Sequence, residues 1–166
     1  MPVTVYHFGP SAFVGLLLRR WLDVPVFVLV NVAVDLEVIV MTAFPMRNYP
    51  VRYMHTLLFG AVVGALWGCL MIPLKGAFQR FMHAIRLRYR PSSSRMIASG
   101  VLGAWFHILI DGLYRTDAGL FWPLRWKNPL CRFGKNEVEW LCILGSVAAL
   151  TVYAFIRAGG GDGGVS

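Results

Sequence analysis

Four apolar stretches, each close to twenty residues long, constrain this chain more than any other feature of its sequence. They cover residues 24–44, 53–74, 96–114 and 137–156. A helix needs about 20 apolar residues to cross the hydrocarbon core of a bilayer. The composition agrees, because only 14% of the residues are charged, against about 25% in ordinary soluble domains. The sequence therefore predicts an all-α integral membrane bundle of four transmembrane helices.

Two further segments complete the predicted fold. Residues 11–22 are apolar but cover only roughly 18 Å as a helix, so we expect a short N-terminal helix with Ser11 as its N-cap. Residues 75–95 carry six basic side chains and no acidic one, with apolar residues at helical spacing. This pattern predicts a basic interfacial helix, and a solvated basic loop is the alternative. Residues 1–158 should form one membrane-embedded helical domain, followed by a disordered glycine-rich tail at 159–166.

The charge balance indicates the partner of this domain. Sixteen Lys and Arg against eight Asp and Glu give a net charge of +8. In a chain this apolar, membrane lipids with anionic headgroups are the expected partner, and no nucleic-acid-binding module is visible. The basic segment at 75–95 is assigned to the cytoplasmic side. We therefore expect a multi-pass protein of the cell (inner) membrane, and the sequence makes no prediction of its oligomeric state.

Five titratable side chains lie inside or at the start of the apolar stretches, where each costs about 2.5–3.5 kcal/mol on insertion scales. They are Asp35, Glu37, His55, His107 and Asp111. The three stretches that carry them contain no Lys or Arg, so ion pairing cannot explain the carboxylates. His107 and Asp111 are four residues apart and project from one face of a helix. A divalent cation would account for such a set.

A metal site at this position would draw its ligands from several helices. The predicted ligands are His7, Asp35, His55, His107 and Asp111, which all fall between the bilayer midplane and the interface opposite the basic segment. Imidazoles together with carboxylates favour zinc, with manganese or iron as alternatives. Glu37 lies about 200° around the helix from Asp35. We therefore expect it to act as a general base or as a residue that orients a ligand.

Small residues predict where the helices pack closely. Gly60, Gly64 and Gly68 form two overlapping GxxxG patterns, which let membrane helices approach each other. Gly100 and Ala104 lie in register with His107 and Asp111. The close-packing face of that helix is therefore also its polar face.

The order of these residues resembles that of a family of small inner-membrane proteins of bacteria and archaea described as metal-dependent hydrolases. That family is distantly similar to zinc-dependent phospholipase C and the S1/P1 nucleases. The resemblance covers residues 6–129 and rests on His7, Asp35-Leu36-Glu37, His55-Thr56, His107 with Asp111, and Trp122-Pro123. Val51 stands where the family often has a further histidine. The resemblance implies hydrolysis of a phosphoester or a similar bond at a membrane.

The expected function is that of a membrane-bound metal-dependent hydrolase. Its substrate would be a phosphoester or a lipid-linked molecule, attacked by a metal-activated water. Glu37 is the first candidate for the general base, and Asp35 takes that role if Glu37 does not. Two alternatives come from other classes: an intramembrane metal-binding or transport component, and a non-catalytic scaffold subunit that uses the glycine face.

Overall fold

The computed structural model describes residues 5–44, 53–116, 119–124 and 126–159, and within these residues every regular element is helical. The α-helices are α1 (Val5–Leu17), α2 (Val24–Ala43), α3 (Leu57–Met71), α4 (Lys75–Ala84), α5 (Ser93–Gly112) and α6 (Lys135–Ala158). Short 3-10 turns, Tyr53–His55 and Ile72–Leu74, flank α3. Four segments, which contain α2, α3 with α4, α5 and α6, are long and apolar enough to cross a membrane. The predicted all-helical class and the four candidate spans are confirmed.

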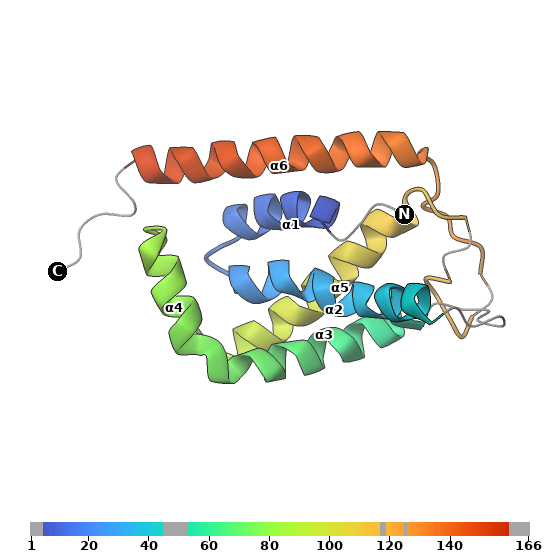
Figure 1. The fold of residues 1–166 in the computed structure, drawn as a ribbon, viewed down its shortest axis with the longest axis horizontal. Coiled ribbons are helices and arrows are strands. Elements are labelled where there is room, and N and C mark those ends of the chain that lie inside the picture. The colour runs from blue at the N-terminus through green and yellow to red at the C-terminus, as the bar shows by residue number, and fades with distance from the viewer. Residues whose placement is uncertain (1–4, 45–52, 117–118, 125, 160–166) are drawn as a thin grey trace.

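The helices form a bundle in which α5 crosses the others obliquely (Figure 1). Helices α6 and α3 form opposite edges of the bundle, with α1, α2 and α5 between them. The most extensive contacts join α3 to α5 and α1 to α6. Helix α4 turns away from the end of α3 and covers one end of the bundle. Because α5 contacts α1, α2 and α3, its polar face is directed into the centre.

The first helix differs from its prediction, because α1 spans Val5–Leu17 and includes Pro10. Ser11 is therefore a buried residue inside the helix and not its N-cap. Proline inside a helix removes a hydrogen bond, but here Gly9 and Pro10 pack directly against Ser146 and Gly145 of α6. The helix also ends at Leu17, five residues before the predicted end at residue 22.

The predicted basic helix over 75–95 is correct only in its first half. Helix α4 ends at Ala84, and Arg86 adopts a positive φ of 57°, which a continuous right-handed helix does not allow. The following residues are extended and return to the bundle, where the Tyr89 hydroxyl donates a hydrogen bond of 2.6 Å to Asp23 Oδ2. Asp23 is also the N-cap of α2, since its carboxylate accepts from Val26 N. Helix α5 then begins at Ser93.

The glycine faces of α3 and α5 meet as the spacing predicts. A Cβ atom built on Gly100 would meet the carbonyl oxygen of Gly64, and one built on Gly68 would lie 2.6 Å from Ile97 Cα. A larger residue at either position would push the two backbones apart. Of the tail predicted at 159–166, Gly159 is the C-cap of α6, and residues 160–166 lie outside the described part of the chain.

Candidate metal centre

The five predicted metal ligands come from four separate elements and meet inside the bundle. His7 lies in the first turn of α1, Asp35 on α2, His55 at the end of the 3-10 turn before α3, and His107 with Asp111 on α5. Their exposed fractions range from 0% for His107 to 7% for Asp35. Burial of this many titratable groups at one point needs a compensating interaction.

The facing atoms of these side chains lie at short and similar separations. Asp35 Oδ1 is 3.4 Å from His107 Nε2 and 3.7 Å from His55 Nε2. The two oxygens of Asp111 lie 3.6 Å from His55 Nε2 and 3.2 Å from His7 Nε2. Most of these distances exceed the 2.7–3.2 Å of ordinary N–H···O hydrogen bonds. They agree with the edge of about 3.3 Å that separates two ligands held tetrahedrally at 2.0–2.1 Å from zinc.

The buried imidazole nitrogens support the same interpretation. The Nε2 atoms of His7, His55 and His107 are buried and make no hydrogen bond of acceptable geometry within the described residues, although carboxylate oxygens lie 3.2–3.7 Å away. A buried polar atom without a partner costs about 1–3 kcal/mol, so three of them together need an explanation. The residues present therefore fit a divalent cation, which would accept all three lone pairs. Two ligand groups, His7/Asp35/His107 and His55/His107/Asp111, satisfy the distances for a metal site.

These two groups share His107, and a single Nε2 atom binds a single ion. The second nitrogen of His107 is not available, because Nδ1 lies 2.9 Å from Asn31 Oδ1. The arrangement therefore favours one ion bound by ligands from both groups.

Asn31 fixes the protonation of His107. Its amide nitrogen lies 2.7 Å from the Val28 carbonyl oxygen and 3.0 Å from Ser11 Oγ. Because a carbonyl oxygen only accepts, the amide NH2 must point there and Oδ1 must face His107. Oδ1 then accepts the proton of Nδ1, and the lone pair on Nε2 of His107 points toward Asp35. Metal-binding histidines commonly have such a partner on the other nitrogen.

Glu37 has the corresponding relation to His55. Its carboxylate accepts hydrogen bonds from Tyr53 N at 2.9 Å and Met54 N at 3.0 Å, and His55 Nδ1 lies 3.3 Å from Oε2. These contacts hold the 3-10 turn against α2 and direct His55 Nε2 toward the two aspartates. Of the two roles open to Glu37, this geometry favours the orienting one.

Two residues around Asp111 were not singled out from the sequence. Arg115, one turn further along the chain, has Nη1 at 3.8 Å from Asp111 Oδ2, and its side chain is only 12% exposed. The Tyr114 hydroxyl donates to Asp111 Oδ1 at 3.2 Å. Spacing carried a signal for both Asn31 and Arg115. Asn31 lies four residues before Asp35 on the same face of α2, and Arg115 follows Asp111 by four residues just past the end of α5.

Comparison of the chain with family models, with curated proteins and with solved structures found no match. The site is therefore interpreted from its own geometry.

Proposed function

We propose that the protein is a membrane-embedded, metal-dependent hydrolase of phosphoesters, in which the ligands of the ion are drawn from His7, Asp35, His55, His107 and Asp111 and leave one position for water. The observation that carries the proposal is the convergence of three buried Nε2 atoms, all without hydrogen-bond partners among the described residues, on two aspartates. A divalent ion bound there, most simply zinc, supplies a water of lowered pKa and polarises a substrate oxygen. This proposal agrees with the resemblance of the sequence to the inner-membrane metal-dependent hydrolases.

Asp35 is the better candidate for the proton acceptor. Glu37 already accepts two backbone N–H groups and faces His55 Nδ1, which makes it a positioning residue. Asp35 faces the two histidines that flank the site, and it is the carboxylate of α2 that lies at the candidate ligands and can accept the proton of an attacking water.

Arg115 indicates the charge of the substrate. Its guanidinium adjoins Asp111 at the end of α5 and is largely buried. A guanidinium offers five N–H donors in a planar fork that matches phosphate oxygens. A phosphoester therefore fits the site better than a neutral ester or amide. Replacement of Arg115 by methionine should raise KM for an anionic substrate and leave the metal content unchanged.

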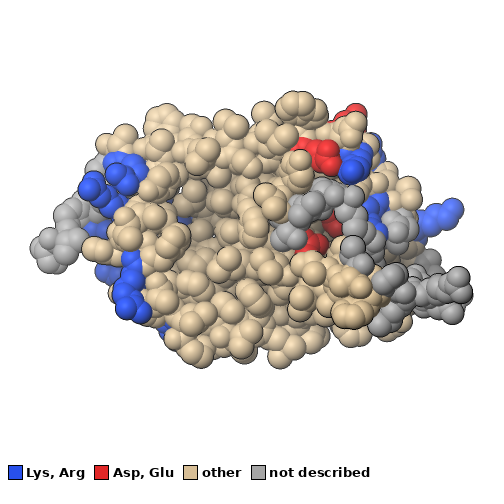
Figure 2. All heavy atoms as spheres, viewed as in Figure 1, with Lys and Arg blue, Asp and Glu red and all other residues tan. Residues whose placement is uncertain are grey.

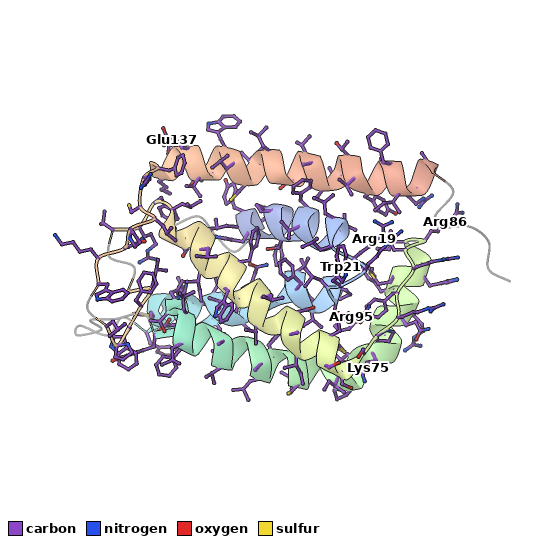
Figure 3. The ribbon with its side chains drawn as sticks, turned by 180° about the vertical axis from the view of Figure 1, so that it is seen from behind. Arg19, Trp21, Lys75, Arg86, Arg95 and Glu137 are labelled. Carbon is purple, nitrogen blue, oxygen red and sulfur yellow. The ribbon has the colours of Figure 1, made fainter. Side chains whose placement is uncertain are left out.

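The basic end of the molecule supports placement against anionic lipid. Figure 2 shows one group of Lys and Arg side chains at the end of the bundle where α4 lies, and others at the opposite end beside Asp and Glu side chains. Arg19, Lys75, Arg86 and Arg95 lie together at this end, with Trp21, whereas Glu137 lies at the opposite one (Figure 3). Each basic residue near an anionic surface contributes about 1 kcal/mol. This end would face the cytoplasmic leaflet of the inner membrane, and the metal centre would lie nearer the other face.

The experiment compares turnover of bis(p-nitrophenyl) phosphate by detergent-purified wild type, Glu37→Gln and Asp35→Asn, each with limiting and with saturating zinc. A positioning role for Glu37 predicts that excess zinc restores most of the turnover of Glu37→Gln, because loss of an orienting residue lowers metal affinity about 10–100-fold. Asp35→Asn should stay inactive at every zinc concentration. His83→Ala, an exposed histidine on α4, is the matched control. Full activity of Asp35→Asn would refute the mechanism, and metal-saturated wild type without turnover would refute the hydrolase proposal.

A further inference from the structure

A cavity of about 510 Å³ lies beside the metal centre, between the second half of α2 and the beginning of α3. Leu36, Val40 and Met41 of α2 form one wall, and Phe59 and Val63 of α3 form part of the other. The volume lies within the roughly 300–1,000 Å³ of ligand pockets in proteins. Nothing in the proposed chemistry uses this space.

One side chain separates the cavity from the centre. Glu37 lines the cavity, and its Oε2 lies 3.3 Å from His55 Nδ1. The other nitrogen of that histidine faces Asp35 and Asp111. A molecule in the cavity therefore ends within about one side chain of the candidate ligands, and Arg115 lies beyond them, next to Asp111.

The lining shows what kind of molecule fits. Apart from Glu37 the cavity is lined by apolar and aromatic side chains, and both oxygens of Glu37 already accept backbone N–H groups. A polar solute would therefore lose its hydrogen bonds to water and gain few in return. The rim is apolar as well, since Leu36 is 50% exposed and Val40 is 44% exposed. Because α2 and α3 are candidate membrane spans, an apolar rim on these helices would contact the hydrocarbon chains of lipids.

We propose that this cavity binds the hydrocarbon chain of an anionic lipid substrate, whose phosphoryl headgroup lies at the metal centre near Arg115. The assignment rests on the proposed function and names the substrate class. A chain that enters from the bilayer leaves a medium as apolar as the cavity, so burial itself gives little affinity. The cavity therefore acts through shape: it fixes how far the headgroup reaches and selects the chain.

Chain binding is measured apart from hydrolysis. The protein is reconstituted in phosphatidylcholine nanodiscs with a phosphatidic acid analogue that carries a diazirine in one acyl chain, and the adducts are mapped by mass spectrometry. Adducts should concentrate on residues 36–41 and 53–63. Val63→Trp, which fills the cavity, should reduce them roughly 10-fold or more, since one methylene of misfit in an apolar pocket is already worth 10–200-fold. Val62→Trp is the matched control, because Val62 is 50% exposed and is not part of the lining.

Val40→Trp, with Ile39→Trp as its control, repeats the test from the α2 wall in case Val63→Trp does not fold. Hydrolysis of dioleoyl phosphatidic acid and of water-soluble p-nitrophenyl phosphate is then measured on the same samples. The cavity-filling variants should lose the lipid substrate and keep the soluble one. Adducts spread evenly over all exposed apolar faces would overturn the cavity assignment, even if hydrolysis occurs. Adducts at the cavity without hydrolysis of these two substrates or of bis(p-nitrophenyl) phosphate would instead overturn the substrate assignment and the proposed function, and leave lipid binding established.

Discussion

Asn31→Leu is the sharpest test of how a neighbouring side chain orients and protonates His107 for metal binding. Leucine is close to asparagine in size, so the change removes the acceptor for His107 Nδ1 while it keeps the packing of a fully buried position. Without metal, His107 can move its proton to Nε2. With metal, Nε2 must be unprotonated, so the proton stays on Nδ1 beside a leucine methyl group. The cost therefore falls mainly on the metal-bound state.

The size of the effect follows from the 2.9 Å contact between His107 Nδ1 and Asn31 Oδ1. Leaving a buried donor without a partner costs about 1–3 kcal/mol. Since 1.4 kcal/mol is a factor of ten, metal affinity should fall roughly 5–150-fold. An independent expectation, about 10–100-fold for loss of a group that orients a metal-binding histidine, covers the same range.

Zinc affinity is measured by competition with a fluorescent chelator, on detergent-purified protein whose helicity is checked by circular dichroism. Ser11→Ala is the control, because Ser11 Oγ accepts a hydrogen bond from the Asn31 amide and acts on His107 only through Asn31. It should leave the affinity within about 2-fold, since Asn31 keeps its bond to the Val28 carbonyl. A folded Asn31→Leu with the affinity of wild type would refute the idea that Asn31 fixes the proton on His107.

Two further predictions concern the packing of the bundle. Gly100→Ala should lower the free energy of unfolding by about 1–3 kcal/mol, because its Cβ would meet the Gly64 carbonyl. Gly76→Ala should be neutral or stabilising, because a Cβ there would have nothing within 4 Å. Thermal unfolding of the two variants is the test, and equal melting temperatures would contradict the close approach of α3 and α5. Burial raises the pKa of the Asp23 carboxyl above 3.8, although the Tyr89 hydrogen bond lowers it. Ionisation of Asp23 therefore costs stability as pH rises through its folded-state pKa, and Tyr89 offsets part of that cost. Tyr89→Phe should lower the melting temperature at neutral pH, and the deficit should shrink as the buffer is made more acidic and the carboxyl becomes protonated. A deficit that does not change with pH would contradict this role.

The length of the apolar stretches was sufficient to find the candidate membrane helices, because about twenty consecutive apolar residues are typical of a helix that spans a bilayer. Helix ends were less predictable. The sequence placed a helix start after Pro10, yet α1 includes that proline because Gly9 and Gly145 allow close contact with α6. Contacts of this kind join distant segments and leave no local signal. The same is true of the end of α4 at Ala84, because the segment that follows is held to the bundle by the hydrogen bond from the Tyr89 hydroxyl to Asp23.

The candidate ligands could be found individually, because titratable residues are costly in an apolar stretch. Their orientation could not. Only the folded chain shows that Glu37 contacts the backbone of Tyr53 and Met54, and that His107 has Asn31 as its partner. An uncharged asparagine costs less in a membrane than a carboxylate, and it was therefore passed over. The feature of the sequence that could have identified Asn31 is its position one turn before Asp35.

The central claim, that the convergent histidines and aspartates hold a metal ion, is tested most directly by elemental analysis of the detergent-purified protein. Wild type is expected to contain close to one equivalent of a divalent transition metal per chain, because His107 offers a single nitrogen to the site. His107→Ala should lose the metal and keep its helicity, while His83→Ala should retain a full equivalent. Folded wild-type protein without metal, even after incubation with zinc, or His107→Ala with unchanged metal content, would contradict the account.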